Sequence, residues 1–234
     1  MSKSRQQEHP KVQRLRRIIF GGFGALLLVV GAIGVYSIFS PVPSELDEGR
    51  HYQVLPGAEA PRQGPIVVTE YFSYGCVHCR NFEPQIVAWS SSLPEDVRFE
   101  RVPVAFSSGW RALARAYYAA EELGILERNH QRVFDAIHVS GLTLSTDESL
   151  AQLFNGNGTD AATFQRTMTS PAVRRKLETA EQRLRDDQVN AVPTLVVDGR
   201  YKITTGELSR RQILAVADRL IEEERAARST TDAG

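Results

Sequence analysis

The feature that most limits how this chain can fold is a strand-like run that leads directly into its only two cysteines. Residues 65–72 read PIVVTEYF, an almost continuous run of β-branched and aromatic residues, which is typical of a strand buried on both faces. Cys76 and Cys79 follow after three residues, at the start of a predicted helix that reaches about Ser91. Residues 97–104 predict the next strand, so the segment indicates a parallel βαβ unit and an α/β fold.

The middle of the chain is helical by pattern. Apolar residues recur at helical spacing in three segments, residues 110–123, 127–139 and 147–154. Asp160 opens a further short helix, and Pro171 stands where a first-turn proline begins a long helix to about Asp187. We therefore expect a helical insertion over about residues 107–187, large enough to form its own subdomain.

Strand patterns return after this insertion. Residues 194–197 and 201–204 flank a turn at Asp198-Gly199, which is typical of a hairpin. An amphipathic helix is predicted over about residues 207–224. A short strand at residues 51–55 completes the expected scaffold.

The charge of the chain is divided between two unlike parts. With 28 basic and 28 acidic residues the whole chain is neutral, which argues against nucleic-acid binding. Residues 1–17 hold six basic residues and one acidic residue, a net charge of +5, and the remainder carries −5. Residues 18–39, IIFGGFGALLLVVGAIGVYSIF, contain no charge and would span roughly 33 Å as a helix.

This apolar run has two interpretations. A cleaved signal peptide has the same basic start, but its apolar region is about 7–15 residues long and an A-x-A-like site follows it. We favour an uncleaved transmembrane anchor, since the run is longer and its only small-residue match is poor. The positive-inside rule then keeps residues 1–17 in the cytoplasm, and either interpretation exports the rest of the chain.

The exported part divides into three segments. Residues 40–50 are rich in proline, serine and acidic residues and predict a linker. Residues 51–226 predict one domain, and residues 227–234 a polar tail.

The spacing of Cys76 and Cys79 predicts redox chemistry. The first turn of a helix leaves backbone N–H groups unpaired and carries the positive end of the helix dipole, so a thiol placed there ionises readily. Cys79 lies one turn further along, close enough to form a disulfide with Cys76, and His78 between them favours the thiolate. A stabilised thiolate makes the disulfide a stronger oxidant.

Three alternative roles for the cysteine pair fit the sequence less well. A structural disulfide across three residues closes too small a loop to stabilise the fold much. A zinc site needs four ligands, and the histidines outside the motif show no paired spacing. Two inert thiols are unexpected in an exported protein, where such a pair would oxidise. We therefore predict no metal and no cofactor besides the Cys76–Cys79 disulfide itself.

A family resemblance rests on the segment TEYFSYGCVHCRNFEP, on Ala191-Val192-Pro193-Thr194 and on the helical insertion. Over about residues 50–226 the chain resembles the DsbA-like thiol–disulfide oxidoreductases of the thioredoxin superfamily. The resemblance implies a thioredoxin-like fold with an inserted helical subdomain, here preceded by one transmembrane helix. Val77 departs from the pattern, since the best-known members carry proline there.

The resemblance also implies roles for individual residues. Pro193 matches a cis-proline beside the cysteines, which exposes the backbone of Val192 to the substrate. Glu70 matches a buried acid beneath the disulfide, and a carboxylate on an apolar strand independently tends toward a raised pKa, which suits a proton relay for Cys79. Tyr74 and Val77, on either side of Cys76, are expected to contact substrate.

Glu83 matches a second acid of the family, although a solvent-exposed position on the helix accounts for it equally well.

The implied function is disulfide donation to exported proteins with free thiols, in the periplasm at the inner membrane of a bacterium. The resemblance further implies reoxidation by a quinone-linked membrane partner. Two alternatives remain, a periplasmic reductase or isomerase that uses the same cysteines, and an anchored copper-delivery protein. The second is usually built on C-x-x-x-C, one residue longer than the spacing here.

Overall fold

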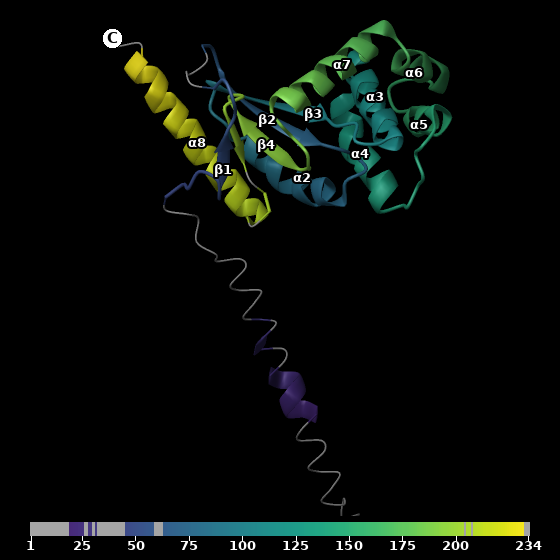
Figure 1. Cartoon of the computed structure of the whole chain (residues 1–234). Coiled ribbons are helices and arrows are strands. Elements are labelled where there is room, and N and C mark those ends of the chain that lie inside the picture. Colours follow the sequence, from purple (N-terminus) through teal and green to yellow (C-terminus); the bar gives the residue numbers. More distant parts are fainter. Residues whose placement is uncertain are drawn as a thin grey trace, which may run out of the picture. The chain divides into compact units, whose positions relative to one another are not determined.

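The computed structural model describes residues 19–25, 28–29, 31, 45–58, 63–203, 205–206 and 208–231 (Figure 1). The chain separates into two units, Met1–Ser44 and Glu45–Gly234. In the first unit, residues 19–25, 28–29 and 31 are helical. The basic tail and the rest of the predicted anchor at 18–39 lie outside the described residues. In the described part of the chain, none of the helices has both the length and the apolar character needed to cross a bilayer.

A mixed five-stranded sheet organises the second unit, in the order β1-β5-β4-β2-β3. The strands are β1 (Tyr52–Val54), β2 (Ile66–Phe72), β3 (Val97–Pro103), β4 (Thr194–Val197) and β5 (Tyr201–Ile203). Strand β2 pairs in parallel with β3 and antiparallel with β4. Six of its seven residues are buried, as its continuous apolar run predicts.

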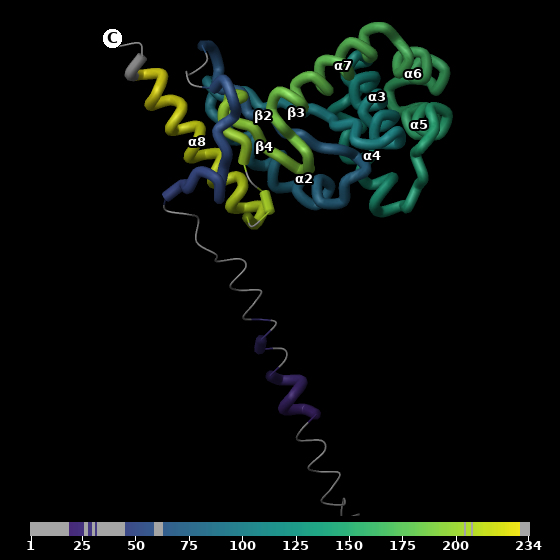
Figure 2. The backbone as a smooth tube through the Cα atoms, viewed as in Figure 1, coloured from purple at the N-terminus to yellow at the C-terminus, as the bar shows by residue number. Residues whose placement is uncertain are grey.

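The described part of this unit also contains seven helices. They are α2 (Val77–Ser90), α3 (Ser108–Glu122), α4 (Leu126–His138), α5 (Asp147–Phe154), α6 (Ala161–Met168), α7 (Pro171–Asp186) and α8 (Arg210–Thr231). Helices α3–α7 gather at one end of this unit as the predicted insertion, and the chain leaves β3 to enter them and returns through α7 to β4 (Figure 2). The thioredoxin-like architecture with a helical insertion is therefore confirmed.

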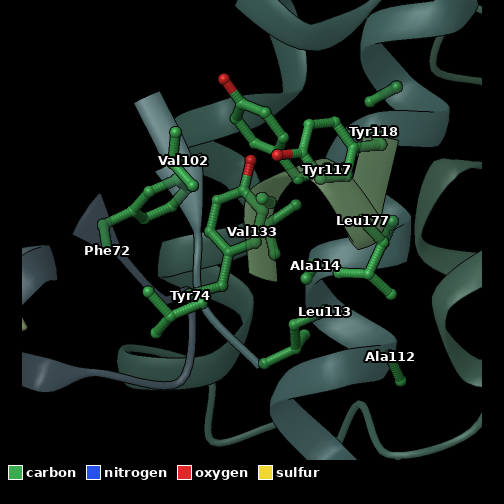
Figure 3. Close-up of a cluster of buried hydrophobic side chains, with 14 of the residues drawn as sticks. Phe72, Tyr74, Val102, Ala112, Leu113, Ala114, Tyr117, Tyr118, Val133 and Leu177 are labelled. Carbon is green, nitrogen blue, oxygen red and sulfur yellow. The ribbon is translucent and has the colours of Figure 1, made fainter. Parts of the chain in front are cut away.

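Two apolar clusters hold the layers together. On one face of the sheet, α2 and α8 pack on β2, β4 and β5 through residues such as Phe82, Ile86, Val216 and Leu220. The larger cluster joins the end of β2 to the helical insertion, where Phe72 and Tyr74 pack near Tyr117 and Val133 (Figure 3). The loop that carries the cysteines is thus part of the core that joins the scaffold to the insertion.

The ends of the domain differ from the sequence-based expectation. The folded unit begins at Glu45 rather than at residue 51, because Leu46 packs on the core and the backbone N–H of Asp47 donates to His51 Nδ1. Helix α8 continues to Thr231 and includes most of the segment that we expected to be a polar tail. Alanine and arginine are strong helix formers, and Arg228 at this end donates to buried Asp198 at 2.8 Å.

We predict that Arg228→Ala destabilises the folded domain by about 1–3 kcal/mol, because it leaves the carboxylates of Asp198 and Glu224 with fewer donors. The measurement is the free energy of unfolding in urea. Arg210→Ala, at an exposed position where the same helix begins, is the matched control and should change stability by less than about 0.5 kcal/mol. Equal effects of the two variants would contradict this role of Arg228.

Candidate active site

Cys76 caps the N-terminus of α2. Its backbone is extended, and its Sγ accepts a hydrogen bond from the backbone N–H of Cys79 at 3.3 Å. The two residues carry free thiols, and Cys76 is 7% exposed whereas Cys79 is fully buried. Cys76 is therefore the sulfur that a second molecule can reach.

The two thiols differ strongly in acidity. The pKa of Cys76 is lowered to about 6, because the Cys79 thiol and the backbone N–H groups of Cys79 and His78 stabilise its thiolate more than burial opposes it. Burial and the neighbouring Cys76 raise the pKa of Cys79 far above its ordinary value. At neutral pH the pair therefore holds one thiolate, on Cys76, and one protonated thiol, on Cys79.

The predicted neighbours of the cysteines come from two segments, the first turn of α2 and the loop before β4. Val77 and His78 are exposed in the first turn of α2, and Val77 is 48% exposed. In the loop before β4, the Val192–Pro193 peptide bond is cis, as the resemblance implies, and the Val192 carbonyl lies 3.6 Å from Cys76 Sγ. The accessible sulfur therefore lies near an exposed apolar side chain and against the backbone carbonyl of Val192.

Tyr74 does not lie on this surface. The structure buries it to 1% exposure, with its ring among aromatic residues of the insertion. The expectation that the Tyr74 side chain binds substrate is therefore corrected. Tyr74 lies just after the buried strand β2, and the helical insertion covers its ring.

A buried charge cluster lies beneath the cysteines. Arg101 Nε donates to Glu70 Oε2 at 2.9 Å, and Arg101 Nη2 donates to Glu83 Oε1 at 2.9 Å. Glu70 is 1% exposed and Glu83 is 3% exposed, so Glu83 is buried rather than in solvent. The parallel register pairs Glu70 with Arg101 across β2 and β3, which explains why these two side chains meet.

The two carboxyl groups have opposite acidity. Burial, against the opposing charge of Arg101 and together with the charges of Glu83 and Cys76, raises the pKa of Glu70 to about 8. Burial alone would also raise the pKa of Glu83, but His130 and Arg101 outweigh it and the pKa falls below its ordinary value. Glu70 can therefore hold a proton near neutral pH, while Glu83 stays ionised.

Sequence reasoning missed three residues of this region. Arg101 could have been found by aligning the two parallel strands, which places it opposite Glu70. His130 and His138 lie on α4, and nothing in their spacing points to the cysteines. Within the described residues, the structure places no three His, Cys, Asp or Glu side chains so that they could bind a metal ion.

Comparison with known proteins gives consistent matches. The profile of the DSBA-like thioredoxin domain family matches residues 67–215. The thiol:disulfide interchange protein DsbA of Azotobacter vinelandii is 36% identical over 217 residues, which cover 91% of this chain and 100% of that protein.

Solved structures agree with these matches. The crystal structure of Pseudomonas aeruginosa DsbA superposes with a TM-score of 0.74 at 38% identity, over 79% of this chain and 97% of that one. The oxidoreductase DsbA of Xylella fastidiosa gives a TM-score of 0.73 at 33% identity, over 80% of this chain and 100% of that one.

We predict that the reduced protein forms a thiolate with a midpoint near pH 6, measured by the absorbance of the thiolate near 240 nm. The signal should be present at pH 7.5 and lost as the pH falls through 6, because the lowered pKa keeps Cys76 charged above that value. Cys76→Ser should remove this transition. A midpoint near the ordinary value for cysteine would contradict the geometry described for Cys76.

Proposed function

The chain belongs to the DSBA-like thioredoxin domain family and is a thiol:disulfide oxidoreductase, and on that premise we propose that it donates its Cys76–Cys79 disulfide to exported proteins in the periplasm. The observation that carries this direction of reaction is the contrast between the two thiols. A reduced state with a stabilised Cys76 thiolate makes the disulfide form a strong oxidant.

The first step is attack on the more exposed sulfur. A substrate thiolate attacks Cys76 Sγ, so that a substrate–Cys76 disulfide forms and the Cys76–Cys79 bond breaks. The electron pair of the broken bond goes to Cys79 Sγ. Because burial raises the pKa of Cys79 so strongly, this sulfur takes up a proton. Glu70, protonated near neutral pH and with one carboxyl oxygen that has no hydrogen-bond partner, supplies that proton and takes up another before Cys76 leaves as a thiolate.

The second step releases the oxidised substrate. A second substrate thiolate attacks the substrate sulfur of the mixed disulfide, and Cys76 leaves as a thiolate. Substrate loses two electrons and gains a disulfide, and the enzyme keeps two electrons as the Cys76–Cys79 dithiol. The lowered pKa of Cys76 makes it a good leaving group, and His78 adds to that stabilisation.

Substrate binding uses the surface around Cys76. The backbone of Val192, held by the cis bond to Pro193, lies beside the sulfur and pairs with an extended substrate segment. Val77, next to Cys76 in the chain, offers an exposed apolar contact. Such contacts to backbone and apolar groups suit a catalyst that accepts many unfolded polypeptides.

Reoxidation and attachment complete the proposal. A quinone-linked protein of the inner membrane restores the disulfide, as the family resemblance implies. The uncharged run 18–39 behind a tail of charge +5 supports a single-pass anchor with the N-terminus in the cytoplasm. A tether at the same membrane raises the effective concentration of this encounter.

We predict that Cys79→Ala accumulates mixed disulfides between Cys76 and exported proteins, because no second enzyme thiol is present to reverse the first step. Non-reducing gels of whole cells, probed for this protein, measure the adducts. Cys76→Ala with Cys79 intact is the matched control and should trap none, since Cys79 is buried. If Cys79→Ala forms no adducts and the wild-type pair stays reduced in cells, disulfide donation is the wrong direction.

For the anchor, we predict that the full chain fractionates with membranes and resists extraction by carbonate. A variant that starts at residue 45 behind a cleavable export signal should be recovered in the soluble periplasmic fraction. Recovery of the full chain in that soluble fraction, with an N-terminus beyond residue 34, would instead support a cleaved signal peptide.

A further inference from the structure

Helix α4 of the insertion contacts Tyr74 at three points. The Tyr74 hydroxyl lies 2.8 Å from His130 Nδ1, and its backbone carbonyl lies 2.8 Å from His138 Nε2. Between these two contacts, the Tyr74 ring meets the ring of Phe134 edge to face, with centroids 5.0 Å apart. His130, Phe134 and His138 recur every four residues and therefore form one stripe along α4.

These contacts fix a residue that lies two positions before Cys76. The turn that follows Tyr74 is tight, since the Cys76 N–H donates to the Ser73 carbonyl at 3.0 Å and the Gly75 N–H donates to Ser73 Oγ at 3.1 Å. Trp110 of α3 packs on Gly75 so closely that a Cβ there would lie 2.5 Å from the indole nitrogen. The loop therefore has little freedom to move without moving Cys76.

The stripe also reaches the buried charge cluster. His130 Nε2 lies 3.2 Å from Glu83 Oε1 and makes no aligned hydrogen bond there. The groups that face His130 are thus the Tyr74 hydroxyl in the loop, Glu83 on α2, and the rings of Phe72 and Tyr117. Because burial holds the pKa of Tyr74 well above its ordinary value, the hydroxyl keeps its proton and can donate it to Nδ1.

We propose that His130 and His138 are positioning residues for the redox reaction, which hold Tyr74 from both ends and thereby keep Cys76 Sγ at the N–H groups that stabilise its thiolate. The helical insertion then sets the oxidising strength of the disulfide. The inference rests on the proposed role of Cys76 as the thiolate that leaves in the second step. Neither histidine touches the sulfur, and each acts through Tyr74.

His138 allows a matched pair of variants. His138→Gln keeps an N–H donor near the position of Nε2, whereas His138→Leu keeps bulk and removes the donor. We expect His138→Leu to weaken the acidity of the Cys76 thiol about three- to tenfold, since the loop loses a hydrogen bond that holds it. The equilibrium constant for oxidation of glutathione should fall by a similar factor. His138→Gln should restore most of both values.

Two variants of His130 likewise test its two contacts one at a time. His130→Asn keeps a polar group near Nδ1 for the Tyr74 hydroxyl, and His130→Gln keeps one near Nε2 for Glu83. We expect the Asn variant to titrate closer to wild type than the Gln variant, because the contact to Tyr74 is the one that fixes the loop. Tyr74→Phe removes only the hydroxyl, and its Cys76 thiol should be about as acidic as that of His130→Gln. It also tests this contact where a histidine variant folds poorly.

The readouts are the thiolate absorbance against pH and the glutathione equilibrium, each beside a thermal melt. Folded His138→Leu and Tyr74→Phe proteins with wild-type midpoints and equilibrium constants would overturn the proposal, and equal losses in Leu and Gln variants would do the same. Failure of the proposed function looks different, because the wild-type protein itself would then lack a thiolate midpoint near pH 6.

Discussion

Cys76 is only 7% exposed, so water can do little to stabilise a negative charge on its sulfur, and the protein must do so instead. The structure meets this requirement with the first turn of α2, whose unpaired N–H groups point at the sulfur, and with the thiol of Cys79. The stabilisation works only while the sulfur stays where the helix begins. One ionised atom therefore constrains the position of that helix, the strand that leads into it and the loop between them.

The charge on Cys76 also affects the protonation of the Glu70 carboxyl group beneath the cysteines. Cys76 contributes to the raised pKa of Glu70, and the influence is mutual, so formation of the Cys76 thiolate and retention of a proton on Glu70 favour each other. With Glu70 protonated, Arg101 is balanced by the ionised Glu83 alone. The buried cluster then holds no excess charge and one available proton. A second full negative charge at Glu70 would work against the thiolate.

Local pattern was enough to predict most of the scaffold, and much less of the charge cluster. Three predictions depend only on neighbours in sequence, and each matched: the strand from the almost continuous β-branched and aromatic run of β2, the helix from the first-turn proline of α7, and the start of α2 at the cysteine pair. No local signal marked Arg101, whose place depends on strand register, and the family match of Glu83 left its burial open, because burial depends on the face that α2 packs inward. Tyr74 was assigned to the substrate surface by proximity to Cys76, and only the packing of α4 against the loop shows that it is buried.

The place of the insertion follows from the topology of the sheet. Strands β2 and β3 are parallel, so their carboxyl ends lie at the same edge, with Phe72 opposite Pro103. A chain that leaves β3 therefore emerges beside the loop that leads from β2 to Cys76, and helices inserted there must cover that loop. Contacts of Trp110 with Gly75 and of α4 with Tyr74 are the result. In this fold the connectivity places the inserted helices against the loop that precedes the reactive cysteine, so that α3 and α4 can influence its chemistry through that loop.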